Sequence, residues 1–128
     1  MPKINRYVDI STIDREAKKD YIDRHSPFVH CESTAKKGEP FKVKVKMGNE
    51  YCHPDDFDHY IAYVQLWDGE TLLAQTNWQP GAMGNQCAHA EVDFYIVPQK
   101  SKLKLTAMSY CTKHGLWESD PVEVTVED

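Results

Sequence analysis

The sequence predicts an all-β protein, an immunoglobulin-like antiparallel β-sandwich with a short N-terminal helical segment. Two observations support this fold class. From residue 41 onward, short segments with alternating or continuous apolar residues recur at hairpin spacing and are separated by turn residues. Residues 11–24, by contrast, are rich in good helix formers. About six or seven short strands in such an arrangement are typical of a β-sandwich.

The helical segment is expected over residues 11–24, "STIDREAKKDYIDR". Ser11 with Asp14 resembles a capping box, and good helix formers follow. Pro27 disfavours a helix that continues past His25, because the residues before a proline avoid helical geometry. We therefore interpret residues 1–24 as an N-terminal extension with a short helix and residues 25–128 as the β-sandwich, within one domain overall.

The first strands end in a predicted hairpin. The segment "FKVKVKM" (41–47) alternates, which predicts a half-buried strand whose lysines form a solvated face. The segment "HYIAYVQLW" (59–67) is apolar on both faces, as expected of a central strand. Asp68 and Gly69 then favour a tight turn into "TLLAQTNW" (71–78).

The later strands place a cysteine at the end of a buried row. After a loop over 79–85, "AHAEVDFYIV" (88–97) alternates again, and His89 falls on its solvated side. In "KLKLTAMSYC" (102–111), the parity of the leucines continues to Cys111, which should therefore point inward. The segment "PVEVTVE" (121–127) completes the series.

Composition and charge exclude several classes of protein. The chain has 128 residues and a net charge of −5, which favours one domain and argues against a nucleic-acid surface. No apolar run approaches the ~18–20 residues of a membrane span, and no secretory signal is visible. We therefore expect a cytoplasmic protein with reduced thiols. Its four cysteines form no CxxC pair, so no four-cysteine zinc or iron site can be built locally.

Three short segments carry residues that could bind a metal. Cys111 and His114 lie three positions apart near the end of a predicted strand. His53 and His59 flank a short loop before the central strand. His25 stands where the helical segment ends, and His30 is the competing choice there.

These residues leave more than one kind of site open. Cys111 with four histidines would overfill tetrahedral zinc and suits a square-pyramidal iron with one open position. A thiolate ligand opposite an open position pushes electron density onto whatever binds there. The rival interpretation, with Cys111 as a catalytic nucleophile, leaves His25, His53 and His59 unexplained. A different class of function is a non-enzymatic β-sandwich that binds zinc or iron structurally or as an oxygen sensor.

The three segments together resemble one known family. "SYCTKHGLWE" is similar to the "YCxxHGLW" segment of superoxide reductases, the neelaredoxin and desulfoferrodoxin family. "HPDDFDHYI" resembles their "HPxxxxHYI" segment, and "DRHSP" resembles their "EKHxP". The three blocks occur in the family's order, and the resemblance covers roughly residues 22–126, in the one-iron, neelaredoxin form.

The resemblance implies a site and an activity. It implies one iron per chain with an axial Cys111 and four equatorial histidines, His25, His53, His59 and His114, and it favours His25 over His30. It also implies one-electron reduction of superoxide to hydrogen peroxide, with an electron donor such as rubredoxin and a homotetrameric assembly. The family fold, an immunoglobulin-like sandwich, agrees with the strand pattern.

Two positions depart from the family pattern. Where the family usually has Glu-Lys, this chain has Asp23 and Arg24, which we expect to act in catalysis. In the family, the glutamate is the sixth ligand of the resting iron, and Asp23 is one methylene shorter. Arg24 keeps the positive charge that attracts superoxide, but it is a poor proton source. Cys31, Cys52 and Cys87 match no family ligand, and we expect a packing role for Cys52.

Overall fold

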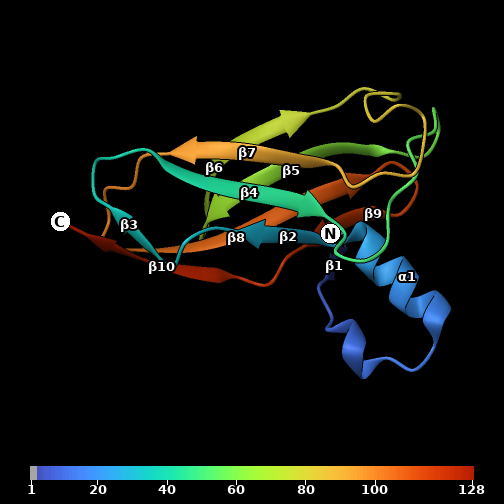
Figure 1. Ribbon diagram of the computed structural model, residues 1–128, viewed down its shortest axis with the longest axis horizontal. Coiled ribbons are helices and arrows are strands. Elements are labelled where there is room, and N and C mark those ends of the chain that lie inside the picture. The colour runs from blue at the N-terminus through green and yellow to red at the C-terminus, as the bar shows by residue number, and fades with distance from the viewer. Residues whose placement is uncertain (1–2) are drawn as a thin grey trace.

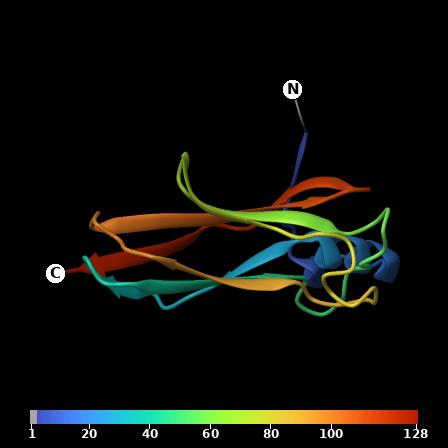
Figure 2. The same ribbon diagram turned by 90° about the horizontal axis from the view of Figure 1, so that it is seen from above.

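The computed structural model describes residues 3–128 as two packed β-sheets with one α-helix at one end (Figures 1 and 2). This confirms the predicted fold class. The helices and strands are β1 (Ile4–Arg6), the 3-10 turn η1 (Ile10–Thr12), α1 (Glu16–His25), β2 (Pro27–His30), β3 (Thr34–Lys36), β4 (Phe41–Met47), β5 (Ile61–Asp68), β6 (Thr71–Asn77), β7 (Glu91–Ile96), β8 (Lys102–Cys111), β9 (Gly115–Glu118) and β10 (Val122–Glu127).

Strand β8 organises the larger sheet. It pairs with β5 along one edge, and on its other edge with β10 near its start and β9 near its end. Strand β6 extends the sheet beyond β5, and the smaller sheet has the order β2-β4-β7. Figure 2 shows the two sheets as separate layers, with α1 and the loops around β5 and β7 gathered at the end opposite the C-terminus. The candidate site lies at this end.

The core lies between the sheets and follows the predicted parity. Alternate residues of β4 and β8 point inward because successive side chains in a strand face opposite sides. Val43, Val45 and Met47 are fully buried, and so are Leu105 and Cys111. The outward lysines of β4 pair with an acidic strand, and Lys44 lies 3.8 Å from Glu91. The prediction of a solvated lysine face is thus confirmed.

The sequence predicted purely antiparallel pairing, but two of the strand pairs are parallel. Strand β1 runs parallel to β9, and β3 runs parallel to β10. Both short strands lie at edges of the larger sheet, and each pairs with a strand that is far away in the sequence. The N-terminal extension therefore contributes a strand as well as the helix.

The helix begins later than predicted. Its first residue is Glu16, and Arg15 precedes it with extended backbone geometry and no side-chain cap. Ser11, the expected cap, instead belongs to η1, where its backbone N–H donates to the carboxylate of Asp9 at 3.0 Å. The helix ends at His25, one residue after the predicted segment, and does not continue past it, as Pro27 indicated. None of the helices in the described part of the chain is long and apolar enough to cross a membrane.

Two further predictions are wrong. Cys52 and Cys87 form a disulfide with their Cα atoms 5.3 Å apart, so not all thiols are reduced. Cys31 and Cys111 are free. His89 is half-buried rather than solvated, and its Nδ1 atom lies 3.0 Å from the carbonyl oxygen of Met47. Strand β7 begins only at Glu91, so strand parity does not extend back to His89.

Candidate metal centre

Four of the predicted donors converge at the helix-bearing end of the sandwich. One ligand atom from each of His25, His59, Cys111 and His114 lies within 4.8 Å of the other three. His53 adjoins this group, with its ring centroid 4.9 Å from that of His25 and 4.8 Å from that of His59. The five side chains come from α1, the loop before β5, the end of β8 and the turn after it.

His25 is held at the last turn of α1. Its Nδ1–H donates to the carbonyl oxygen of Tyr21 at 2.6 Å, because a carbonyl can only accept. This bond leaves Nε2 as the lone-pair nitrogen. The ring also stacks on Trp117, at 5.1 Å between centroids and 18° between planes. The orientation of His25 is therefore set before any metal binds.

His53 and His59 present buried nitrogens that have no hydrogen-bond partner among the described residues. The Nδ1–H of His53 donates to the carbonyl oxygen of Pro54 at 2.7 Å, which leaves Nε2 free. The Nε2 atom of His59 is likewise buried and unpartnered. Buried polar atoms in proteins nearly always have partners. Two orphaned imidazole nitrogens beside two further imidazoles therefore indicate a metal site.

The backbone fixes both of these histidines. His53 forms an antiparallel bridge with Ala88, with N–H to carbonyl distances of 2.9 and 3.0 Å in the two directions. His59 closes a tight turn with Asp56 through two similar bonds, at 2.9 and 3.1 Å. The loop before β5 is thus more ordered than its lack of a regular strand suggests.

Cys111 and His114 lie on the turn between β8 and β9. The sulfur of Cys111 is 3.8 Å from Nδ1 of His114, and the residue is fully buried. Gly115 closes the turn with a φ of +86°, a conformation that glycine adopts without strain. The indole N–H of Trp117 donates to the carbonyl of His114 at 3.2 Å. The glycine and tryptophan of the "HGLW" segment thus support the cysteine–histidine pair.

Burial dominates the electrostatics of the site. It lowers the pKa of His25 to about 3 and that of His53 to about 4, and it also lowers the pKa of His59. At neutral pH His25 and His53 are therefore neutral, which is the form that binds metal, and the shift of His59 favours the same form. Burial raises the pKa of the Cys111 thiol, against the pull of the backbone N–H groups of Lys113 and His114. A bound cation would favour its thiolate.

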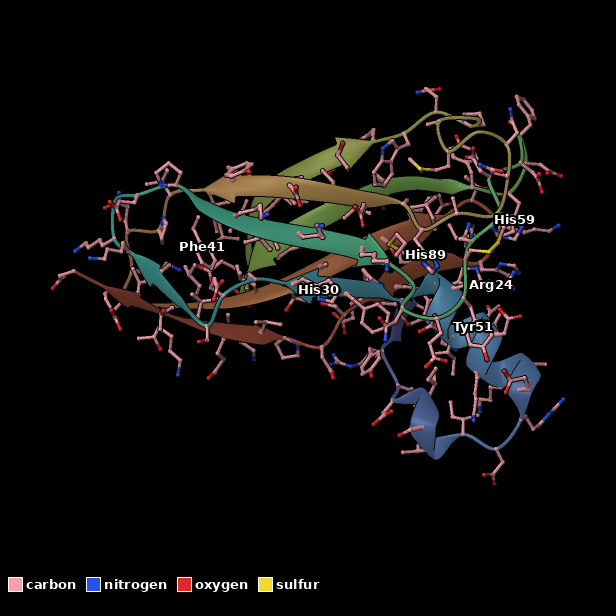
Figure 3. All side chains as sticks on the ribbon, viewed as in Figure 1. Arg24, His30, Phe41, Tyr51, His59 and His89 are labelled. Atoms are coloured by element: carbon pink, nitrogen blue, oxygen red, sulfur yellow. A yellow bond between two sulfur atoms is a disulfide. The ribbon has the colours of Figure 1, made fainter. Side chains whose placement is uncertain are left out.

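A pocket of about 230 Å³ opens over the histidines. It is lined by Ala17, Asp20, Tyr21, Arg24, His25, His59 and His114. Cys111 is absent from this lining, so the pocket gives access to the imidazoles and not to the sulfur. Figure 3 shows Arg24 and His59 at the same end of the sandwich, whereas His30 lies farther along on β2. His30 is exposed and outside the group of donors.

Asp23 and Arg24, the two departures from the family pattern, occupy different positions. Arg24 lines the pocket, and its Nε–H donates to Asp20 one helical turn earlier, at 2.6 Å. Asp23 is buried, and its Oδ2 atom accepts backbone N–H bonds from residues 49, 50 and 51, at 2.8–3.0 Å. This carboxylate oxygen therefore anchors the loop that leads to His53.

Sequence reasoning missed three supporting residues. The ring of Tyr21 packs on His25 and His114, with centroids 4.8 and 5.2 Å apart. Its position four residues before His25 on a helix was the available signal. Trp117 belonged to the quoted motif but had no assigned role. Asp55, which accepts backbone N–H bonds from the 81–85 loop, carried no local signal.

The donor set fits iron better than a closed structural zinc site. Counted with the adjoining His53, the four grouped donors would make four imidazoles and one thiolate, more than the four ligands of tetrahedral zinc, and imidazole with thiolate donors suits iron. The geometry thus defines a class of protein, a β-sandwich with a histidine- and cysteine-lined metal site at one end.

Comparisons with known proteins identify the family. The chain belongs to the desulfoferrodoxin family, whose model matches residues 13–120. A superoxide reductase from Thermococcus kodakarensis is 36% identical over 109 residues, covering 82% of this chain and 89% of that protein. One from Pyrococcus furiosus is 32% identical over 117 residues, covering 82% and 90%.

Solved structures agree with this assignment. A superoxide reductase (neelaredoxin) from Ignicoccus hospitalis aligns with a TM-score of 0.72 at 27% identity, covering 97% of this chain and 95% of that one. A Thermotoga maritima protein aligns with a TM-score of 0.75 at 21% identity, covering 98% and 95%, which supports the fold alone.

Proposed function

We propose that the protein is a superoxide reductase, an oxidoreductase that reduces superoxide to hydrogen peroxide at a mononuclear non-haem iron. The observation that carries this proposal is the convergence of His25, His59, Cys111 and His114 below a pocket from which the sulfur is hidden. The family membership and the named relatives support the same activity.

We assign the iron five protein ligands. The Nε2 atoms of His25, His53 and His59 are the free imidazole nitrogens, whereas His114 offers Nδ1, which lies 3.8 Å from the cysteine sulfur. Cys111 supplies the thiolate from the buried side. When bound, ferrous iron supplies the electron that superoxide receives. We expect one iron per chain, because the described residues 3–128 contain one such group of ligands.

Arg24 has the role of attracting the substrate. Its side chain is 26% exposed and lines the pocket over the histidines. A permanent cation at the mouth raises the local concentration of a small anion. The ion pair with Asp20 holds the guanidinium on the rim and offsets part of its charge. Because arginine does not release its proton near neutrality, the protons of the product come from water.

Asp23 has a positioning role in this proposal. Its Oδ2 atom, held by three N–H groups, keeps the 49–51 loop against α1, next to Cys52 and His53. That engagement favours a structural task over the sixth-ligand role expected from the resemblance. The electron donor, with rubredoxin as the expected type, the homotetramer and the cytoplasmic location stay predictions from the sequence.

The test is metal analysis combined with visible spectroscopy and a superoxide assay. The iron-loaded protein should be coloured when oxidised, bleach on reduction and consume superoxide without producing oxygen from it. Alanine variants of His25, His53, His59 and His114 should each lose iron and activity. Variants His30→Ala and His89→Ala are the matched controls, because neither residue is in the donor group. Stoichiometric zinc, or a colourless protein with no activity, would refute the proposal.

A further inference from the structure

The disulfide is attached directly to the metal site through the backbone. Cys52 immediately precedes His53, and Cys87 immediately precedes Ala88. His53 and Ala88 form the reciprocal pair of backbone hydrogen bonds described above. The disulfide and this bridge therefore join the same two loops at adjacent positions. The first loop lies between β4 and β5, and the second loop lies between β6 and β7. Neither cysteine belongs to the group of metal donors, in which Cys111 supplies the sulfur.

The disulfide adds a covalent bond to a junction that also contains several hydrogen bonds. Besides the bridge, the carboxylate of Asp55 accepts backbone N–H bonds from Gly81, Met83 and Asn85, at 3.3, 2.8 and 3.0 Å. Figure 1 shows both loops at the end of the sandwich that carries α1. Neither loop forms a regular strand over these residues. The second loop thus restrains His53 through polar contacts and one covalent bond, in addition to the packing of Trp78 and Met83 against the core.

The two sulfur-bearing residues are accessible to small reagents. Cys87 is exposed and Cys52 is half-buried, whereas the ligand Cys111 is fully buried. Susceptibility of a cysteine to oxidation rises with exposure. A second cysteine within disulfide distance converts the first oxidation product into a stable disulfide.

We propose that Cys52 and Cys87 form a peroxide-oxidised dithiol site whose disulfide state secures His53 in the metal centre. The sulfur of Cys87 attacks one oxygen of hydrogen peroxide, the O–O bond breaks, and a sulfenic acid and water form. The sulfur of Cys52 then displaces the sulfenic oxygen as a second water. The two thiols lose two electrons in total, and the peroxide gains them.

The proposed function supplies the oxidant, since hydrogen peroxide is its product, and in that respect the inference rests on it. Oxidation would then restrain the backbone next to His53 during turnover, when the enzyme produces peroxide. In the dithiol state His53 keeps its hydrogen bonds but loses the covalent restraint next to it. Loss of the hydrogen-bond partners that orient a metal ligand commonly weakens metal binding by about 10–100-fold, and we expect loss of this backbone restraint to act in the same direction.

The first experiment tests the modification itself. Ferric-loaded protein is reduced with a phosphine, freed of reductant without air, and treated with one equivalent of added hydrogen peroxide. Alkylation and peptide mass analysis should then show a Cys52–Cys87 disulfide, with Cys31 still alkylated. Cys31→Ser is the matched control and should behave as the parent. Persistence of both thiols, or oxidation of Cys31 in their place, would overturn the proposal.

The second experiment tests the coupling to His53. Transfer of iron to a chelator is timed for the disulfide and dithiol forms of the parent. We expect at least roughly 10-fold faster transfer from the dithiol form, and the same fast rate from the double variant Cys52→Ser with Cys87→Ser in both conditions. Equal rates for all forms would refute the coupling. Superoxide consumption is measured separately. A protein that consumes no superoxide, but forms the Cys52–Cys87 disulfide with peroxide and releases iron more slowly in the disulfide form, would refute only the proposed function.

Discussion

The Nδ1 atom of His114 lies 3.1 Å from the Nε2 atom of His25, although 89 positions separate the two residues in sequence. Because the Nδ1–H of His25 donates to Tyr21, its Nε2 atom carries a lone pair directed at His114. A hydrogen bond between the two nitrogens requires that His114 carries its hydrogen on Nδ1 and donates it to Nε2 of His25. A metal ion bound by both would replace that hydrogen.

This contact joins the end of α1 to the turn after β8. His53 and His59 come from a third segment, between β4 and β5. No single segment supplies enough ligands for a stable site, so the fold must be complete before the metal is fully bound. A metal that binds only the folded chain stabilises it by mass action. Iron content and stability should therefore change together in ligand variants.

Replacement of the buried sulfur tests the assignment of Cys111 as a ligand. Cys111→Ser should leave a folded sandwich, because the change is small, but should abolish the visible colour and lower activity by at least roughly 100-fold. The physical reason is that a serine hydroxyl is a poor substitute for a thiolate ligand. Circular dichroism, iron analysis and the superoxide assay check the three parts. Normal colour and activity in this variant would exclude Cys111 as a ligand.

Removal of the Asp23 carboxylate tests its positioning role. Asp23→Ala leaves three backbone N–H groups at residues 49–51 without their acceptor, in a partly buried loop. We expect a loss of about 2–4 kcal/mol in the free energy of unfolding, measured by urea titration. The visible spectrum of the folded oxidised protein should stay close to that of the parent. Asp58→Ala, at an exposed position, is the control.

A changed oxidised spectrum with unchanged stability would give the opposite result for Asp23. It would mean that the carboxylate reaches the iron and that its loop contacts are secondary. The two readouts therefore separate a ligand from an anchor.

Strand parity explains why much of the fold was predictable from sequence. In β8, alternation placed Cys111 inward, and the residue is fully buried. The turn at Gly69 between β5 and β6 was also predicted, since its residues favour a tight hairpin. Both signals are local: they depend on the period of a strand and the geometry of a turn.

The remaining features depend on contacts between distant segments. The parallel pairing of β1 with β9 joins residues more than 100 positions apart, and nothing local in "INR" indicates it. The disulfide depends on the 5.3 Å between two Cα atoms, a distance set by the packing of two loops. The sequence-based prediction that Cys52 and Cys87 are reduced relied on the expected cellular compartment, because the distance between them cannot be read from the sequence.

The candidate site was predictable only as a combination. A cysteine and a histidine three positions apart are common by chance, and the histidine pair at 53 and 59 has ordinary alternatives. Resemblance to a family selected these residues and preferred His25 to His30. The structure adds what motifs cannot contain, such as the engagement of Asp23 by the 49–51 loop.

The charge of Arg24 should control the rate at which superoxide arrives. Arg24→Ala should slow substrate binding most clearly at low ionic strength, because salt screens the attraction of exposed charges. Arg24→Lys keeps the charge and should bind superoxide nearly as fast as the parent. Since lysine can release a proton where arginine cannot, peroxide release should if anything be faster. Pulse radiolysis over a range of ionic strength measures both steps.

Equal binding rates for Arg24→Ala and the parent at low salt would contradict the steering role. Asp20→Asn provides a matched control, because it removes the negative partner of Arg24 and retains the cation. We expect this variant to bind superoxide faster than the parent at low salt, and to lose that advantage as salt is added.

Acidification should destabilise the metal-free protein through its buried histidines. Folding lowers the pKa of His25 from 6.5 to about 3 and that of His53 from 6.5 to about 4, chiefly by burial. Below pH 6.5 the unfolded chain therefore binds protons that the folded chain does not, and the equilibrium shifts toward unfolding. Stability is fully present above pH 6.5 and falls progressively as the pH approaches 4.

Urea midpoints of metal-free protein between pH 8 and 4 measure the effect, with exposed His30→Gln as a control that should follow the parent. Iron-loaded protein should keep its midpoint to a lower pH, because protons must displace the metal first. A metal-free midpoint that stays constant from pH 8 to pH 4 would show that these two histidines are not buried in neutral form.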